Sequence, residues 1–132
     1  MPEAQGTTTI LLVEDNELNR DMLSRRLKRR GFEVITAVDG ELAAQITGDV
    51  LPDVILMDMG LPGMNGWDAT RMIKSDSRTK HIPVVALTAH AMNLDREQAL
   101  DAGCDAYETK PVEIDRLLET IRRVIDSGRQ SL

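Results

Sequence analysis

The chain has 132 residues, a length that suits one compact domain and is short for two folded domains of ordinary size. Apolar residues make up 42% of the chain and charged residues 29%, which is typical of a soluble globular protein and excludes a largely disordered one. The 22 acidic residues outnumber the 16 basic ones, and the net charge of −6 argues against direct binding to DNA.

Short apolar runs alternate with segments of helical periodicity, a pattern typical of βαβ units around a parallel sheet. In chain order, we expect strands over residues 8–13, 32–38, 54–57, 84–87 and 105–107. We expect helices over residues 17–30, shortly after Asp39, and over residues 67–74, 92–102 and 114–126. One domain then covers residues 8–126, while residues 1–7 and 127–132 are expected to be flexible ends.

The first helix has recognisable start and stop signals. Asn16 is placed to cap its N-terminus, and Gly31 is placed to end it. We expect its inner, apolar face to consist of Leu18, Met22, Leu23 and Leu27. The helix also carries basic residues that form either a solvated face or a docking surface for an acidic partner, namely Arg20, Arg25, Arg26, Lys28, Arg29 and Arg30.

No segment has the size of a membrane span or the composition of a secretory signal. The longest apolar runs, residues 10–13 and 54–57, are far shorter than the ~20 residues that cross a bilayer. The first six residues lack the basic stretch and apolar core of a signal peptide. We therefore expect a cytoplasmic protein. Its lone cysteine, Cys104, is interpreted as a small buried apolar residue, with a reactive thiol as the alternative.

Polar residues stand where four of the predicted strands end. Glu14 and Asp15 follow the first strand, Asp58 the third and Thr88 the fourth, and Lys110 comes just after the fifth. Because ligands bind beyond the carboxyl ends of parallel strands, we expect these side chains to meet at one edge of the sheet. Crowded carboxylates repel one another and require a cation. Oxygen ligands favour Mg²⁺, and a lysine beside the metal suits a transferring phosphoryl group.

These residues, together with Tyr107, Pro111 and the Leu-Pro-Gly-Met-Asn-Gly loop over residues 61–66, resemble the response-regulator receiver family of two-component signalling. The resemblance covers almost the whole chain, from about residue 8 to residue 125. It implies an α/β, flavodoxin-like (βα)5 fold, with a five-stranded parallel sheet in the order 2-1-3-4-5 and helices on both faces.

The resemblance also implies a role for each acidic residue. Asp58 is expected to be the phosphoacceptor, which takes the phosphoryl group from a phosphohistidine of a partner kinase. Mg²⁺ is expected to be bound by Asp58, by Asp15 directly, by Glu14 through water and by the backbone carbonyl of Gly60. The sequence departs from the common family pattern at two of these positions, because Gly60 offers no side chain and Glu14 replaces the more usual aspartate.

By the same resemblance, Thr88 and Lys110 are expected to contact the phosphoryl oxygens, and Tyr107 to turn inward as Thr88 moves. This movement would switch a protein-binding surface. The alternatives are that the Thr88 hydroxyl satisfies a backbone group and that Tyr107 is simply packed. His90 is a candidate modulator of the rate at which water removes the phosphoryl group. Trp67 is interpreted as a packing residue and His81 as a loop residue.

Three other functions compete with this interpretation. A dinucleotide-binding enzyme needs a glycine-rich turn after the first strand, where this chain has Glu14 and Asp15. A phosphatase that works through an aspartyl-phosphate typically has a second aspartate two residues after the nucleophile, where this chain has Gly60. An inert pseudo-receiver stays open, although the complete set of site residues argues against it.

The resemblance implies that output passes through protein binding. The segment over residues 81–111 is similar to single-domain cell-division regulators of alphaproteobacteria and to the receivers of hybrid kinases. The expected partners are a sensor histidine kinase or a histidine phosphotransfer protein, and a downstream protein target, with neither DNA nor a membrane involved. The chain is expected to be a monomer or a phosphorylation-dependent dimer. It is not expected to be an enzyme beyond its own phosphoryl transfer and dephosphorylation.

Overall fold

The computed structural model describes residues 7–61, 66–89, 97 and 100–130. Its strands are β1 (Thr9–Val13), β2 (Glu33–Ala37), β3 (Val54–Asp58), β4 (Val84–Thr88) and β5 (Ala106–Thr109). Its helices are α1 (Glu17–Arg29), α2 (Gly40–Val50), α3 (Gly66–Ser75) and α5 (Ile114–Gln130). Most of the segment over residues 92–102, where the sequence predicts a further helix, lies outside the described residues.

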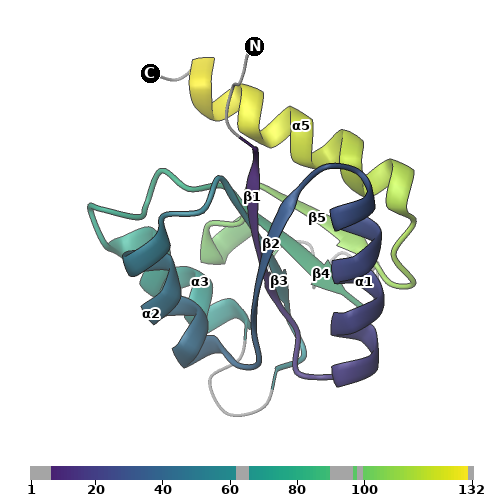
Figure 1. The fold of residues 1–132 in the computed structure, drawn as a ribbon. Coiled ribbons are helices and arrows are strands. Elements are labelled where there is room, and N and C mark those ends of the chain that lie inside the picture. The colour runs from purple at the N-terminus through teal and green to yellow at the C-terminus, as the bar shows by residue number, and fades with distance from the viewer. Residues whose placement is uncertain (1–6, 62–65, 90–96, 98–99, 131–132) are drawn as a thin grey trace.

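The five strands form one parallel sheet in the order β2-β1-β3-β4-β5, which confirms the expected topology. Successive side chains of each strand point to opposite faces. In β1, Leu11 packs in a core with residues of α2 and α3, whereas Ile10 and Leu12 pack with residues of α1 and α5. Figure 1 shows α2 and α3 to the left of the sheet and α1 to its right. Helices therefore cover both faces, as predicted.

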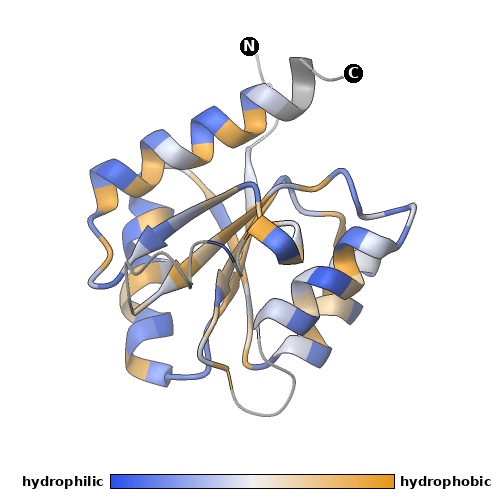
Figure 2. Ribbon diagram, turned by 180° about the vertical axis from the view of Figure 1, so that it is seen from behind, coloured by the Kyte–Doolittle hydropathy of each residue, from blue (hydrophilic) through white to orange (hydrophobic). Residues whose placement is uncertain are grey.

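Two of the three inner strands, β3 and β4, are buried along their whole length. A strand covered on both faces favours continuous apolar sequence, and both strands are apolar up to their last residue. Figure 2 shows the apolar colour concentrated on the sheet, with hydrophilic positions along the helices. Only the final residues, Asp58 and Thr88, are polar. Rigid strands thus hold two of the predicted site residues.

Helix α1 begins and ends at the predicted signals, but its buried face differs from the predicted one. The Asn16 side chain accepts a hydrogen bond from Asn19 N at 2.9 Å, and Gly31 has a φ of 94°. Leu27 is buried, whereas Leu18 and Met22 are 67% and 45% exposed.

The predicted inner face is therefore wrong for Leu18 and Met22. Leu27 follows Leu18 by nine positions, which at 3.6 residues per turn is about two and a half turns. The side chains of Leu18 and Leu27 therefore lie on opposite sides of the helix. Leu23 is partly buried and Ser24 is buried, so these two residues complete the inner face beside Leu27.

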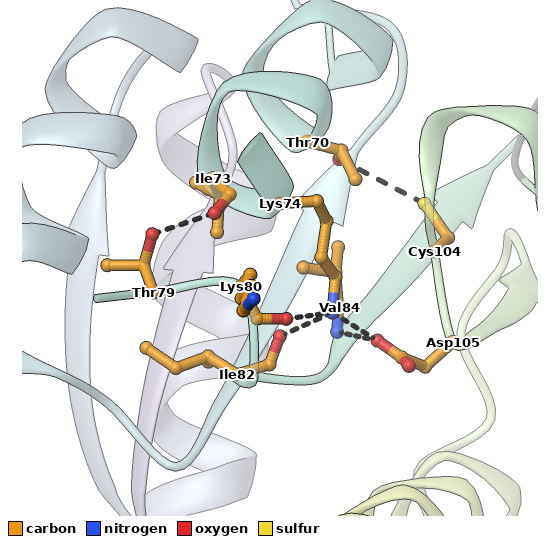
Figure 3. A network of polar contacts seen from close by, with 9 residues as sticks. All are labelled: Thr70, Ile73, Lys74, Thr79, Lys80, Ile82, Val84, Cys104 and Asp105. Atoms are coloured by element: carbon orange, nitrogen blue, oxygen red, sulfur yellow. Dashed lines mark hydrogen bonds and ion pairs between the residues drawn. The ribbon is translucent and has the colours of Figure 1, made fainter. Parts of the chain in front are cut away.

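A polar network fixes the end of α3 to the edge of the sheet (Figure 3). The Lys74 ammonium group donates hydrogen bonds to the carbonyl oxygens of Lys80 and Ile82, at 3.2 and 2.8 Å, and pairs with Asp105 at 2.9 Å. The Asp105 carboxylate also accepts from Val84 N at 2.8 Å. The Lys74 and Asp105 side chains together thereby join α3, residues 80–82, β4 and the start of β5.

Cys104 lies buried beside this network, with its sulfur 3.9 Å from Thr70 Oγ1. Burial raises the pKa of the thiol to about 11, so it stays protonated at neutral pH. The structure supports the interpretation of this residue as a small apolar side chain.

Most ends lie within one residue of those predicted, and the ends of β5 and α5 differ by more. Strand β5 runs over Ala106–Thr109 instead of residues 105–107, because the Asp105 side chain turns back to bind Val84 N and Lys74. Helix α5 continues to Gln130, beyond the predicted end at Asp126, since no proline interrupts this polar segment. Among the described residues, no helix combines the length and the apolar character that crossing a bilayer requires.

Candidate phosphoryl-acceptor site

The predicted site residues lie around one open cleft at the carboxyl edge of the sheet. Glu14 directly follows β1, Asp58 and Thr88 end β3 and β4, and Lys110 directly follows β5. Parallel strands bring these positions together because all their carboxyl ends lie at the same edge. The cleft is lined by Glu14, Asp15, Asn16, Asn19, Asp58, Met59, Gly60, Trp67, Thr88, Ala89 and Lys110.

Three carboxylates form the acidic part of the cleft. Glu14, Asp15 and Asp58 can each offer one oxygen such that the three oxygens lie within 4.8 Å of one another. Glu14 and Asp58 are buried, with 5% and 4% of their surface exposed, whereas Asp15 is open to solvent. An all-oxygen set of this kind fits a hard divalent cation such as Mg²⁺, and an exposed member leaves room for the metal's water ligands.

Lys110 brings a positive charge to the buried pair. Its ammonium nitrogen lies 3.0 Å from Asp58 Oδ1 and 3.6 Å from Glu14 Oε1. Partial burial lowers the pKa of Lys110, but the hydrogen bond and charge of Asp58, with the charge of Glu14, outweigh it and raise the pKa above its ordinary value. Lys110 is therefore positively charged at neutral pH.

Glu14 is the carboxylate most affected by crowding. Burial raises its pKa above the ordinary value of 4.5, and hydrogen bonding and repulsion from Asp58 raise it further. The N–H of Asn16, which donates to Glu14 Oε2 at 3.1 Å, and the charge of Lys110 act in the opposite direction. The negative charge of Glu14 is thus incompletely compensated by the protein alone, and a bound cation would supply the missing charge.

Gly60 and Thr88 complete the rim of the cleft. The Gly60 N–H donates to Asp58 Oδ1 at 3.0 Å, so this carboxylate oxygen is held by both Gly60 and Lys110. Thr88 is buried at the end of β4, and its carbonyl accepts from Lys110 N at 2.8 Å. The backbone of β4 therefore helps to place the lysine.

The remaining candidates lie around this cleft or outside it. Tyr107 is half-buried on β5, opposite Ala86 of β4, and packs against the core on the α2 and α3 face. Trp67 is also half-buried against that core and borders the cleft, in agreement with a packing role. His81 is an exposed turn residue, as interpreted from the sequence, whereas His90 lies outside the described residues.

Two contributors to the site were not identified from the sequence. Arg20 Nη1 donates to the carbonyl oxygens of Glu14 and Asp15, at 3.1 and 3.4 Å, although the sequence assigned Arg20 only to the basic face of the helix. Gly66 begins α3 so close to β3 that an added Cβ would lie 2.5 Å from the Asp58 carbonyl oxygen. Neither contact leaves a clear sequence signal, because one depends on the direction in which the Arg20 side chain turns and the other on how closely α3 packs against β3.

A groove next to the cleft runs between α1 and the loop after β5. It is lined by Met22, Leu23, Arg26, Pro111 and Val112, and it shares Glu14 and Lys110 with the cleft. Other basic residues of the region form ion pairs, with Arg25 at 3.0 Å from Asp21 and Arg30 at 2.9 Å from Asp115. The exposed Met22 thus borders a partly apolar groove that is continuous with the acidic site.

Known proteins share both this fold and this sequence pattern. The family described as "Response regulator receiver domain" matches residues 10–122. The chain is 40% identical, over 116 residues, to the polar-differentiation response regulator DivK of Brucella ovis, and the match covers 88% of this chain and 94% of that protein.

Two solved structures extend the comparison. One is the receiver domain of sensor histidine kinase PA1611 from Pseudomonas aeruginosa, which has a magnesium ion coordinated in its active-site cleft. It matches with a TM-score of 0.85 and 36% sequence identity, and the match covers 92% of this chain and 99% of that chain. The other is the receiver domain of Ssk1 from Saccharomyces cerevisiae, solved with the histidine phosphotransfer protein Ypd1. It matches with a TM-score of 0.81 and 30% sequence identity, and the match covers 87% of this chain and 86% of that chain. The chain therefore belongs to the response regulator receiver domain family of two-component signalling proteins.

Proposed function

We propose that this receiver is a phosphorylation-switched signalling protein, in which Asp58 accepts a phosphoryl group from a phosphohistidine of a partner protein. The observation that carries the proposal is the convergence of Glu14, Asp15, Asp58 and Lys110 on one cleft. A purely structural ion pair would need one acid and one lysine. Three acids beside a lysine suit a site that binds both a cation and a phosphoryl group.

In the proposed reaction, an oxygen of Asp58 attacks the phosphorus of the phosphohistidine. The new O–P bond forms as the P–N bond breaks, and the imidazole leaves with the electron pair of that bond. Glu14, Asp15, Asp58 and the Gly60 carbonyl would hold Mg²⁺, whose chemistry is to neutralise the oxygens of the transferring group. Lys110 would add a second positive charge to the same oxygens.

The proposed switch follows from the change of charge at Asp58. The free carboxylate accepts hydrogen bonds from Lys110 and Gly60, and a phosphoryl group of about −1.5 to −2 charges would compete for the same donors. Thr88 would contact its oxygens, and Tyr107, on the neighbouring strand, would follow the movement of Thr88. The result would be a changed surface for a downstream protein target.

We place the phosphohistidine partner on the groove lined by Met22, Leu23, Arg26 and Val112. This groove adjoins the acidic cleft, so a partner seated there would bring its histidine to Asp58. Its partly apolar lining and the charge of Arg26 favour a partner surface that combines apolar and acidic residues. The Ssk1 receiver, in complex with a histidine phosphotransfer protein, supports a partner of this class. A cytoplasmic location and a phosphorylation-dependent dimer stay predictions.

The acceptor can be tested with acetyl phosphate as the donor. Wild-type protein and the Asp58→Asn variant are incubated with acetyl phosphate, with Mg²⁺ or with EDTA, and intact mass is measured. We expect one phosphoryl group on wild-type protein with Mg²⁺, and none with EDTA or on Asp58→Asn. Asp49→Asn, which changes an exposed acid of α2, is the matched control and should be labelled like the wild type. Labelling of Asp58→Asn would show that another residue is the acceptor.

The docking groove has a separate test, which uses a phosphorylated histidine kinase or phosphotransfer protein that labels the wild type. Met22→Glu is expected to slow that transfer and to leave labelling by acetyl phosphate unchanged, because only the large donor needs the groove. Leu100→Glu changes an exposed apolar residue elsewhere and should affect neither reaction. Equal transfer to wild type and Met22→Glu would remove the groove from the proposal.

A further inference from the structure

Arg20 binds the backbone of the acidic turn that follows β1. This residue lies in the second turn of α1, and its Nη1 atom reaches back to the carbonyl oxygens of Glu14 and Asp15, at 3.1 and 3.4 Å. The side chain is half-buried, and it makes no ion pair with a described carboxylate. Its charge is therefore directed at backbone oxygens, although acidic side chains stand close by.

The same turn is fixed from other directions as well. The N–H of Glu14 donates to the carbonyl of Ala37 at 3.0 Å, and the N–H of Asn16 donates to the Glu14 side chain at 3.1 Å. Arg20 N donates to the carbonyl of Asn16 at 2.9 Å, and this hydrogen bond closes the first turn of the helix that Asn16 caps. Through its side chain, Arg20 joins the rigid helix to the two residues that precede the cap.

We propose that Arg20 is a positioning residue for the cation site, and this inference rests on the proposed function. By holding both carbonyl groups, Arg20 fixes the orientation of the peptide units on either side of the Asp15 Cα. The orientation of these units decides where the exposed Asp15 side chain points relative to the buried Glu14 and Asp58. Without this contact, Asp15 would have to be ordered when a cation binds, and the ordering would cost conformational entropy.

The charge of Arg20 acts in the opposite direction, because a cation repels another cation. Arg20 is half-buried, and the hydrogen bonds described for its guanidinium group go to carbonyl oxygens. Water and salt screen such a repulsion strongly. Groups that orient metal ligands typically change metal affinity by about tenfold or more when they are removed. Removing Arg20 is therefore expected to weaken Mg²⁺ binding through the loss of positioning more than it strengthens Mg²⁺ binding through the loss of a repelling charge.

The experiment compares Mg²⁺ binding by wild type, Arg20→Met, Arg20→Lys and the matched control Arg25→Met, followed through the fluorescence of Trp67. We expect Arg20→Met to raise the Kd for Mg²⁺ by about tenfold. Arg25→Met removes the same charge from the same helix, away from the turn, and should bind like the wild type. Both Arg20 contacts come from Nη1 alone, and a lysine ammonium group can also donate to two carbonyls, so Arg20→Lys should keep more of the wild-type affinity than Arg20→Met.

A second measurement separates positioning from general damage to the fold. The urea midpoint of the metal-free protein is expected to be nearly the same in wild type and Arg20→Met. Unchanged Mg²⁺ affinity in Arg20→Met would overturn the inference. An equal loss of Mg²⁺ affinity in Arg25→Met would also overturn it. So would a fall in the urea midpoint of metal-free Arg20→Met that is large enough to account for its loss of Mg²⁺ affinity. Wild-type protein that binds no Mg²⁺ would overturn the proposed function itself, and the wild-type titration reports this outcome separately.

Discussion

Lys110 Nζ lies 3.0 Å from Asp58 Oδ1 and 3.6 Å from Glu14 Oε1, so one ammonium group bridges two buried acids that follow different strands. This relationship links the stability of the receiver to its chemistry. The lysine offsets part of the repulsion between the acids when no metal is bound. Under the proposed function, it would also contact the oxygens of a phosphoryl group on Asp58. The same contact is therefore expected to hold the resting state together and to be exchanged on phosphorylation.

Replacing Lys110 with methionine should separate these two effects. The variant loses the counter-charge of Asp58 and Glu14, and its metal-free stability is expected to fall by about 1–3 kcal/mol. Its Mg²⁺ affinity should rise by roughly fivefold, because a neighbouring positive charge has been removed. Urea unfolding in EDTA and a Mg²⁺ titration measure the two quantities. Lys80→Met, on an exposed side chain, should change neither. A weaker affinity for Mg²⁺ in Lys110→Met would contradict this electrostatic account.

Glu14→Gln should stabilise the metal-free protein at neutral pH. The pKa of Glu14 is raised in the folded state, so its contribution to stability is present below the ordinary value of 4.5 and is lost as pH rises through the raised pKa. Glutamine keeps the shape without the charge. We expect the variant to exceed the wild type by about 1 kcal/mol at pH 7 in EDTA, and the difference to vanish below about pH 4.5. Urea unfolding across this range tests the sign, with the exposed Glu41→Gln as control.

The sheet and the convergence of the site were predictable because both follow from local pattern. The apolar runs that end in Asp58 and Thr88 identify buried parallel strands, and parallel strands bring their carboxyl ends together. The side of α1 that faces the core could not be predicted in the same way. Its apolar residues surround more than one side of the helix, so Leu18 and Met22 fit the helical period as well as Leu27 does. Only packing against β1 and β2 decides which of them is buried.

Two contacts of the site were also beyond the sequence pattern. Arg20 has the same local signature as the other basic residues of α1, yet it alone among the described members of that cluster binds the acidic turn. Gly66 belongs to a glycine-rich turn, which indicates a loop but not which backbone it approaches. The Arg20 contact depends on the direction in which its side chain turns back over the preceding bend, and the Gly66 contact depends on how closely α3 packs against β3.

Gly66→Ala tests how closely α3 must approach the acceptor strand. An alanine Cβ would lie 2.5 Å from the Asp58 carbonyl oxygen and 2.9 Å from Met59 Cα, and both are backbone atoms that cannot turn aside. We expect a loss of stability of about 2–3 kcal/mol and slower labelling of Asp58, since relief of the clash must move β3 or α3. Gly48→Ala is the control, because its Cβ would meet only the end of the Arg78 side chain at 3.4 Å. Equal stability of the two variants would show that α3 shifts freely.

Leu51→Gly should stabilise the fold. Leu51 caps the C-terminus of α2 with a φ of 54°, a left-handed conformation that is unfavourable for a leucine, and its side chain is 53% exposed. Glycine adopts this conformation without steric cost, so we expect a gain of about 0.5–1 kcal/mol in the free energy of unfolding. The neighbouring Val50→Gly, inside the helix, should lose a similar amount. A loss in both variants would mean that the partial packing of Leu51 outweighs its backbone strain.

Lys74→Met tests the network that joins α3 to the N-terminal ends of β4 and β5 (Figure 3). Asp58 lies at the other end of the sheet, where the strands end. The Lys74 side chain is only 18% exposed, and its ammonium group donates hydrogen bonds to the Lys80 and Ile82 carbonyls and pairs with Asp105. Its removal leaves these acceptors without their shared donor, and we expect a loss of about 2–3 kcal/mol in urea unfolding. Arg71→Met breaks an exposed pair on the same helix and should cost at most about 0.5 kcal/mol. Because the network lies far from Asp58, Mg²⁺ affinity should stay unchanged in both variants, and a changed affinity in Lys74→Met would show that α3 transmits strain to the site.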